Sequence, residues 1–287
     1  YTYYKCGFTI QNFVSELNSP KRNMSKPRKY LKGLKNQIGV IDALLFRELL
    51  TKKNFSYLGF VGILLEPLLI TSVYLIILRL IRIDLKVGIN IFLFFATGIL
   101  IFSFFVSIVT RSANAMKANK NLFYYKRVKP IDTVIARTFI EATVVLIVYF
   151  LILSIIFYIN NEIILDNLPI LLLVFTLIIV LAFSVGLIVL IIGNKFQNTQ
   201  NLLPLFTRPL FFTSGAIFPI EFIPSNLRRF ILWNPLLHAS ELARNALDKK
   251  YLLVEQISLN YLLFNALIFL GLALFIYQKE ERKLIVK

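Results

Sequence analysis

The chain of 287 residues has few of the residues that build most catalytic and metal sites. Its single cysteine, Cys6, excludes a disulfide within the chain, and its single histidine, His238, leaves no Cys/His spacing typical of zinc. No G-x-x-x-x-G-K-[ST] loop for nucleotide phosphates occurs, and no Ser or Cys nucleophile pattern surrounds His238. We therefore expect no catalytic residue, no metal site and no enzymatic activity.

Charged residues are also scarce, at 16% of the chain, whereas hydrophobic residues make up 57% and the mean hydropathy is +0.73. Soluble domains average about 25% charged residues. The composition is that of an integral membrane protein. A net charge of +17 would suggest nucleic acid as the partner of a soluble domain, but the basic residues cluster in particular loops. Membrane topology explains them better, and no nucleic-acid partner is expected.

Six apolar runs predict an all-α integral membrane fold with six transmembrane helices, because a bilayer core of about 30 Å needs about 20 apolar residues. The fifth run is short for a full span. The runs are Leu58–Leu78, Ile89–Val109, Thr138–Ile159, Leu168–Ile192, Leu202–Phe218 and Leu259–Tyr277.

The positive-inside rule places both termini in the cytoplasm. Lys and Arg concentrate before the first run, in Arg111–Arg137 and after Lys279. We expect a transmembrane domain over residues 57–278 and cytoplasmic tails over 1–32 and 279–287. Two interpretations of the first tail stay open: a natural start at Met24, or a longer flexible extension.

Residues 33–56 form a separate segment before the membrane domain. Within it, Gly33–Lys53 has apolar residues at roughly the i, i+3, i+4 spacing of an amphipathic helix. Arg47, Lys52 and Lys53 are among the basic residues around it. We predict an interfacial helix that lies along the cytoplasmic surface and contacts membrane lipids.

The stretch from Leu202 to Arg244 begins as a membrane helix and is then interrupted by Pro219, Pro224 and Pro235. Its apolar piece Phe230–Ala239 is too short to span a bilayer. Non-helical backbone is tolerated at membrane depth only when it is buried in protein or lines a water-filled cavity. The stretch therefore predicts broken, re-entrant helices between the fifth and sixth spans, facing a transport pathway.

Two ionisable residues fall inside apolar runs. Glu66 lies in the first run and Arg208 in the fifth. Because intramembrane charges normally face a partner or water, we hypothesise that they approach each other or line the same aqueous cavity. The alternative is that each snorkels separately to the interface.

Four segments, in register, resemble the membrane subunits of ABC-2 type exporters, and among them the capsule polysaccharide exporters. An Arg-containing helix followed by Leu-Glu-Pro carries the first likeness, and N-x-x-L-x-Y-Y-x-x-V-x-P-x-D the second. SGAIFPIEFIP and WNPLLHASELAR are the third and fourth. The segments are Leu44–Leu69, Asn119–Arg137, Ser214–Pro224 and Trp233–Arg244. The family usually has a Trp shortly before Leu-Glu-Pro, where Gly62 and Ile63 stand here.

The resemblance implies a homodimeric permease that moves lipid-linked capsular polysaccharide across the bacterial inner membrane. Each copy would bind a separate ATPase subunit, which holds ATP and Mg, so this chain would bind no cofactor. Further periplasmic and outer-membrane export components would complete the machine. Exporters of O-antigen, teichoic acid, another lipid-linked polymer or small hydrophobic compounds share the architecture and stay open as alternatives.

The resemblance also implies two sets of site residues. The first would couple the permease to the ATPase, although its basic members could equally be ordinary positive-inside residues: Asn114, Lys117, Asn119, Lys120, Leu122, Tyr124, Tyr125, Lys126 and Arg127. The second would line the translocation path or its gate: Glu66, Arg208, Ser214, Phe230, Trp233, Asn234 and His238.

Two functions of another class compete with transport. A membrane-embedded glycan-processing enzyme would need clustered carboxylates on the outer face, and Glu162, Asp166 and Glu221 form no such pattern. A purely structural scaffold would leave the broken segment without a purpose. For His238, a helix-capping or buried hydrogen-bonding role is favoured over that of a proton carrier.

Overall fold

The computed structural model describes residues 37–48, 88–123, 128–160, 165–196 and 198–285, with isolated helical positions between 65 and 77. All regular secondary structure in these ranges is helical. The chain divides into two compact units, Tyr1–Gly39 and Val40–Lys287, and the helix bundle belongs to the second.

Four long helices of this bundle are apolar enough to cross a membrane, over Ile91–Ala113, Pro130–Tyr158, Leu168–Lys195 and Leu259–Glu281. At 1.5 Å per residue, even the shortest, of 23 residues, covers a core of about 30 Å. They correspond to four of the six predicted runs, and the chain is a multi-pass membrane protein. As complete helices they are α4 (Ile91–Ala113), α6 (Pro130–Asn160), α7 (Leu168–Lys195) and α11 (Leu259–Ile285).

The two remaining predicted spans are not among these four helices. The first, Leu58–Leu78, lies outside the described residues except for a few helical positions. The fifth, expected over Leu202–Phe218, is α8 (Thr199–Thr213), which is 15 residues long and contains Pro204 and Pro209. It ends before the predicted boundary because the chain turns at Gly215, whose φ of +67° a helix cannot accommodate.

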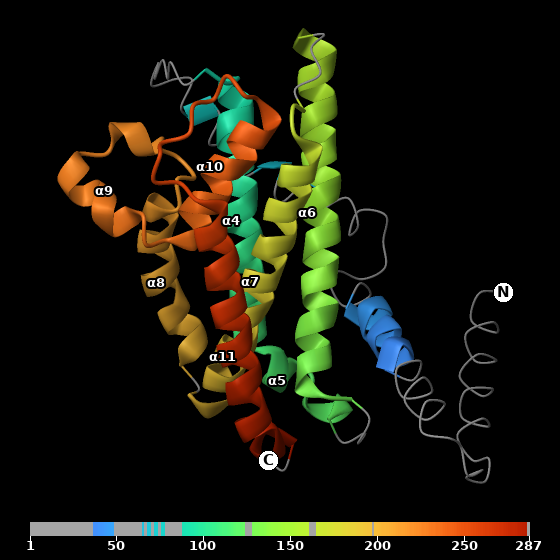
Figure 1. Ribbon diagram of the computed structural model, residues 1–287. Coiled ribbons are helices and arrows are strands. Elements are labelled where there is room, and N and C mark those ends of the chain that lie inside the picture. Colours follow the sequence, from blue (N-terminus) through green and yellow to red (C-terminus); the bar gives the residue numbers. More distant parts are fainter. Residues whose placement is uncertain are drawn as a thin grey trace, which may run out of the picture. The chain divides into compact units, whose positions relative to one another are not determined.

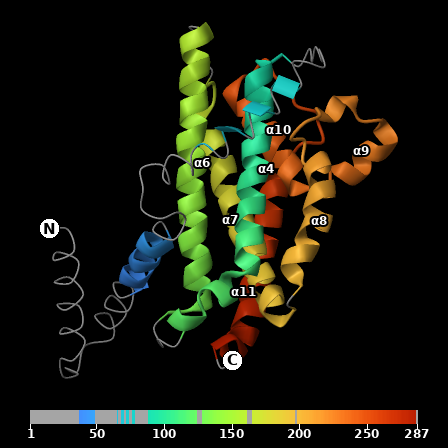
Figure 2. The ribbon, with the colours of Figure 1, turned by 180° about the vertical axis from the view of Figure 1, so that it is seen from behind.

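Helix α7 is the central helix of the bundle and packs against α4, α6, α10 and α11. Figures 1 and 2 show α6 on one flank of the bundle and α8 on the other. Two glycines let α7 approach α4 closely: a Cβ on Gly193 would collide with the Ala113 backbone, and one on Gly186 would lie 2.9 Å from Ser112 Oγ. Small residues at such contacts are typical of packing between membrane helices.

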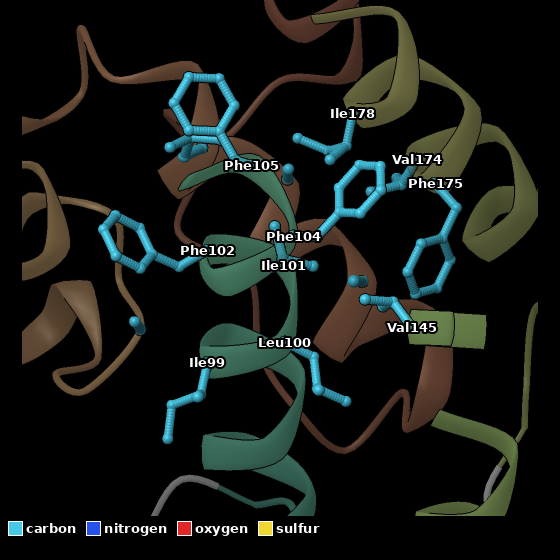
Figure 3. Packing of buried hydrophobic residues seen from close by; sticks show 14 of the residues in the cluster. Ile99, Leu100, Ile101, Phe102, Phe104, Phe105, Val145, Val174, Phe175 and Ile178 are labelled. Carbon is cyan, nitrogen blue, oxygen red and sulfur yellow. The ribbon is translucent and has the colours of Figure 1, made fainter. Parts of the chain in front are cut away.

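The core is a close packing of aliphatic and aromatic side chains around α4. Figure 3 shows Phe104 of α4 together with Phe175 of α7 and Val145 of α6. A polar contact is embedded in the same core, where the Thr97 and Tyr149 hydroxyls lie 3.1 Å apart and join α4 to α6. Packing and this buried hydrogen bond together fix the register of the two helices.

Short helices occupy the two ends of the bundle. At one end, α4 continues into α5 (Ala115–Ala118) and η1 (Lys120–Leu122), near the C-terminal end of α11 (Figure 1). Toward the other end, α8 is followed by η2 (Ile220–Phe222), α9 (Ser225–Ile231) and α10 (Pro235–Leu247).

Each predicted proline break lies at the start of one of these later elements. Pro219 and Pro224 are the residues before η2 and α9, and Pro235 is the first residue of α10. Proline suits the first turn of a helix, where its missing N–H is not needed, and it interrupts the helix before it. The chain after α8 is thus divided into short helices at these prolines, whereas their re-entrant placement in a membrane stays a prediction.

Candidate functional site

A buried ion pair lies on α10. Glu241 and Arg244 are one turn apart, and Arg244 Nη1 donates to Glu241 Oε1 at 3.0 Å. Both side chains are excluded from solvent, with 1% and 0% of their surface exposed. Two charges in such surroundings are tolerated only when further hydrogen bonds satisfy their remaining atoms.

Those further bonds come from three other parts of the chain. Arg244 Nε donates to the Phe94 carbonyl at 3.1 Å, and Nη2 donates to the Gly215 carbonyl at 2.6 Å. The Tyr251 hydroxyl donates to Glu241 Oε2 at 2.6 Å. We call these five residues the Arg244 cluster. It joins α4, the turn after α8, α10 and the loop after α10.

The Phe94 ring and two glycines complete the cluster. The guanidinium carbon of Arg244 lies 3.5 Å from the centre of the Phe94 ring, a cation–π contact. A Cβ at Gly98 would lie 2.5 Å from Arg244 Nη2, and one at Gly215 would lie 2.6 Å from Leu237 Cδ1. Side chains at either position would displace the elements that the arginine holds together.

Tyr251 stays protonated in these surroundings. Burial, followed by the charge of Glu241, raises the pKa of Tyr251 above its ordinary value. The hydroxyl therefore remains a hydrogen-bond donor to Glu241 at any physiological pH. The geometry of the Arg244 cluster suits fixing the broken segment in place rather than chemistry on a substrate.

The Arg244 cluster was not among the predicted site residues. The E-x-x-R of WNPLLHASELAR contributed to the family resemblance, but Glu241 and Arg244 were not assigned a role. An acid and a base three residues apart within an apolar segment were the available signal, since such a pair faces one side of a helix.

A second junction is built around His238, which is 2% exposed. Its Nδ1 accepts the Ser258 N–H at 3.1 Å, so Nε2 must carry the proton and donate to the Leu232 carbonyl at 2.8 Å. Burial lowers the pKa of His238, which lies outside the four candidate spans. The ring packs against Tyr261 at a tilt of 38°, with the ring centroids 4.6 Å apart, and the Tyr261 hydroxyl donates to the Trp233 carbonyl at 3.0 Å. This geometry matches the buried hydrogen-bonding role favoured from the sequence.

Asn234 and Ser214, two more predicted gate residues, lie where α8 meets α10. Asn234 Oδ1 accepts the Leu236 N–H at 3.0 Å and caps α10, while its Nδ2 donates to Thr213 Oγ1 at 3.2 Å. Ser214 is 2% exposed, and its carbonyl accepts the Ser240 hydroxyl at 2.6 Å. The structure thus brings Ser214, Asn234 and His238 onto connected elements, with their polar atoms engaged in holding α8, α10 and α11 together.

The other path candidates are exposed or undescribed. Phe230 and Trp233 have 75% and 78% of their surface exposed, and Arg208 is exposed on α8. Glu66 lies outside the described residues, so its pairing with Arg208 stays a prediction. The part of the chain that the structure describes holds no group of three His, Cys, Asp or Glu residues able to bind a metal ion.

At the α5 end of the bundle, the predicted interfacial helix contacts the predicted coupling segment. Residues 37–48 are helical, and Arg47 Nη1 donates to Asn119 Oδ1 at 2.6 Å. Asn119 is 2% exposed, and its Nδ2 donates to the Ala115 carbonyl at 2.8 Å. Glu48 accepts from Arg137 Nε of α6 at 2.8 Å. Lys52 and Lys53 lie outside the described residues.

Arg137 and Arg111 extend this contact across α4 and α6. Arg137 Nη1 donates to the Arg111 carbonyl at 2.5 Å, and the Arg111 guanidinium lies 3.2 Å from Glu141. We call Arg47, Glu48, Arg111, Asn119, Arg137 and Glu141 the end network. Through this network, the helix over residues 37–48 is joined to the start of α6 and to the segment after α4.

The remaining coupling candidates divide by exposure. Asn114 Nδ2 donates to Gln200 Oε1 at 2.6 Å, which ties the α4–α5 junction to α8. Lys117 and Lys120 are exposed, and Leu122 is half-buried. Tyr124, Tyr125, Lys126 and Arg127 lie outside the described residues.

Comparison with known proteins places this architecture in a family. Residues 40–247 match the family described as ABC-2 type transporter. The polysialic acid transport protein KpsM of Escherichia coli is 35% identical over 253 residues, 88% of this chain and 98% of the relative. The capsule polysaccharide export inner-membrane protein BexB of Haemophilus influenzae is 28% identical over 72% of this chain and 78% of the relative. CtrC of Neisseria meningitidis serogroup B, which bears the same description, is 28% identical over 71% and 77%. With a family match over most of its length and a full-length relative above 30% identity, the chain belongs to the ABC-2 type transporter family.

Proposed function

We propose that this protein is the membrane-spanning permease of an ATP-binding-cassette exporter that moves lipid-linked capsular polysaccharide across the bacterial inner membrane. The family match and the functions for which KpsM, BexB and CtrC are named support the substrate class. The proposal assigns ATP hydrolysis to a separate subunit, and it includes a homodimer, six spans, cytoplasmic termini and periplasmic and outer-membrane partners.

The end network is the observation that carries the mechanism. An exporter must pass movement from a cytoplasmic ATPase to its spans, and short helices at the end of a bundle are suited to docking. Between α5 and η1, the buried Asn119 is bonded to Arg47, while the adjacent Glu48 is bonded to α6. A push on this segment would therefore reach the interfacial helix and α6 together, because charge-assisted hydrogen bonds join all three.

At the opposite end of the bundle, two sets of buried contacts hold α10 rigidly in place beside the proposed gate. The Arg244 cluster and the His238 junction fix α10 to α4, α8 and α11. Phe230 and Trp233 precede α10 in the chain, with their side chains exposed. In the proposed exporter, the fixed part of the broken segment holds these aromatic residues at the periplasmic mouth of the path.

The test separates binding of the ATPase from transmission of its movement to the spans. Full-length protein is co-purified with its ATPase partner, and surface glycan is measured in cells that depend on each variant. K117E/K120E should lose the ATPase, because both lysines are exposed on the docking segment. E48R and R137E should each keep the ATPase but lose export, and the double variant E48R/R137E should recover part of it. K249E/K250E, which reverses two exposed charges after α10, is the matched control and should behave as wild type.

Two results would contradict the proposal. Normal surface glycan after deletion of the gene would remove the capsular substrate, and export of a different lipid-linked polymer would then identify the alternative. Wild-type export in both E48R and R137E would remove the end network as the transmission element.

A further inference from the structure

Helix α11 is longer than a membrane span requires. Its 27 residues, Leu259–Ile285, extend about 40 Å at 1.5 Å per residue, whereas a bilayer core is about 30 Å thick. The apolar part of the helix is followed by the polar run Gln278–Lys283. The last turns of α11 therefore lie outside the hydrocarbon core, at the end of the bundle that carries α5 (Figure 1).

One face of these last turns is nevertheless buried. Tyr277, Glu281 and Leu284 follow one another at spacings of four and three residues, which places them on one side of the helix. Tyr277 and Leu284 each have only 5% of their surface exposed, whereas Gln278 and Lys279 are exposed. A buried leucine that follows a polar run indicates a helix end that is docked on the rest of the protein.

The apolar contacts of this face involve the α5–η1 segment. Tyr277 and Leu284 belong to a hydrophobic cluster with Ala115 and Met116 of α5 and with Phe123, which follows η1. Among the described residues, this cluster is distinct from the larger one around α4. Because closely packed side chains transmit displacement, a movement of the α5–η1 segment would reach the end of α11.

A polar contact joins the same face of α11 to the start of α6. Lys129 Nζ lies 3.0 Å from Glu281 Oε1, and the Tyr277 hydroxyl donates to the same oxygen at 3.4 Å. The Lys129 N–H donates to Asp132 Oδ2 at 3.0 Å, which caps the start of α6. Lys129 is thus held to α6 by its backbone and to α11 by its side chain. We call Lys129, Tyr277, Glu281 and Leu284 the α11 latch.

The ion pair of the latch fixes position rather than the fold. The Lys129 and Glu281 side chains are 48% and 26% exposed, and ion pairs so close to solvent contribute little to stability. What the pair determines is where the chain entering α6 lies relative to α11. The end network already bonds Asn119 to Arg47, so the latch is a second and separate attachment of this end of the bundle.

We propose that the α11 latch is a positioning element for the ATPase partner, which holds the α5–η1 segment and the start of α6 in the arrangement that the ATPase binds. This role rests on the proposed export function and adds the C-terminal helix to the elements on which ATPase binding depends. Without the latch, the segment adopts the binding-competent arrangement only part of the time. The apparent affinity then falls in proportion to the competent fraction, whereas binding at saturation is unchanged.

The test measures the affinity of the full chain in nanodiscs for the ATPase subunit that co-purifies with it, labelled with a fluorophore and titrated in nucleotide-free buffer. K129E and E281K should each weaken binding by about tenfold, which corresponds to a competent fraction of about one tenth. The double variant K129E/E281K brings opposite charges together again and should recover most of the affinity. K250E/E255K exchanges two exposed charges in the loop after α10 and, as the matched control, should bind like wild type.

The charge exchange separates positioning from direct contact. If Lys129 itself touched the ATPase, K129E would weaken binding, E281K would not, and the double variant would fail to recover, which would overturn the proposal. Thermal unfolding of all three variants should match wild type, since the pair is partly exposed. A parallel loss of affinity and thermal stability in E281K that the added K129E does not correct would show a structural role alone and would overturn the proposal as well.

The apolar half of the latch has its own pair of variants. L284A removes a buried side chain and should weaken ATPase binding, whereas L284M preserves its volume and should bind like wild type. Wild-type affinity in both E281K and L284A would overturn the latch and leave the export function intact. The absence of any ATPase co-purifying with the wild-type chain would instead remove the proposed function.

Discussion

Arg244 is a fully buried cation with four partners: the Glu241 carboxylate one turn away on α10, and the Phe94 carbonyl, the Phe94 ring and the Gly215 carbonyl from distant parts of the chain. Replacing it with methionine preserves much of the volume but leaves Glu241 as a buried carboxylate with only Tyr251 as its donor. We expect R244M to lower the free energy of unfolding by about 3–5 kcal/mol, the usual cost of breaking a buried pair from one side. Thermal unfolding of the detergent-solubilised protein, followed by size-exclusion chromatography, would measure it.

The double variant E241L/R244M is the control for this prediction. Removing both charges together leaves no uncompensated ion, and such replacements are often neutral. It should therefore be more stable than R244M. If the double variant is no better than the single one, the bonds to Phe94 and Gly215, rather than the ion pair, account for the stability.

His238 gives a prediction on pH. Because burial lowers its pKa in the folded protein, the unfolded chain takes up a proton that the folded chain does not. The stability that depends on neutral His238 is complete above its ordinary pKa of about 6.5 and is lost as the pH falls below that value. Wild type should thus lose more thermal stability than H238Q between pH 7.5 and 5.5. An equal loss in both proteins would mean that other groups set the pH dependence.

The residue contacts show where prediction from sequence ends. The Asn234 cap could be read locally, since Asn followed by Pro typically starts a helix. The Arg244 cluster could not, because Phe94 lies 150 residues from Arg244 in the chain. Arg137 and Glu141 show the same limit. Their spacing suits a local pair, but Arg137 bonds Glu48 and Glu141 contacts Arg111.

At the scale of elements, four spans were predicted because length and apolarity are local properties of the chain. The end of α8 was placed too late, since Ser214–Phe218 continues the apolar run and only the left-handed turn at Gly215 stops the helix. The helical part of the interfacial segment was expected from its periodicity. Its attachment to Asn119 and Arg137 was not, because the periodicity of a helix does not identify its partners.

Two glycines give a matched test of how these elements pack. Gly193 of α7 lies against the Ala113 backbone of α4, whereas a Cβ at Gly271 of α11 would meet nothing within 4 Å. G193A should lower the free energy of unfolding by about 1–3 kcal/mol, because the two backbones must separate. G271A should be neutral or slightly stabilising, since alanine favours the helix. Thermal unfolding of both variants would measure this, and equal behaviour would show that α4 and α7 are not held at close approach.

At the scale of the whole molecule, two distinct ends serve the proposed exporter. The exposed lysines of α5 and η1 and the end network lie at one end, together with the C-terminal end of α11 (Figure 1). Helices α9 and α10 lie toward the other end of the bundle (Figure 1). Each of the candidate spans between them is long enough to cross a bilayer, so in the proposed exporter the two ends would lie on opposite sides of the membrane. Docking to a cytoplasmic ATPase is possible only if the lysine-bearing end faces the cytoplasm.

Impermeant maleimide labelling tests this orientation. With Cys6 replaced by serine, single cysteines are placed at three exposed positions: Lys117 in α5, Arg229 in α9 and Lys250 in the turn after α10. In spheroplasts, R229C and K250C should be labelled and K117C should not, because the positive-inside rule holds the basic end in the cytoplasm. Inverted vesicles should reverse the pattern. Labelling of K117C from outside would place α5 on the wrong side for an ATPase, and the coupling role of the end network would fail with it.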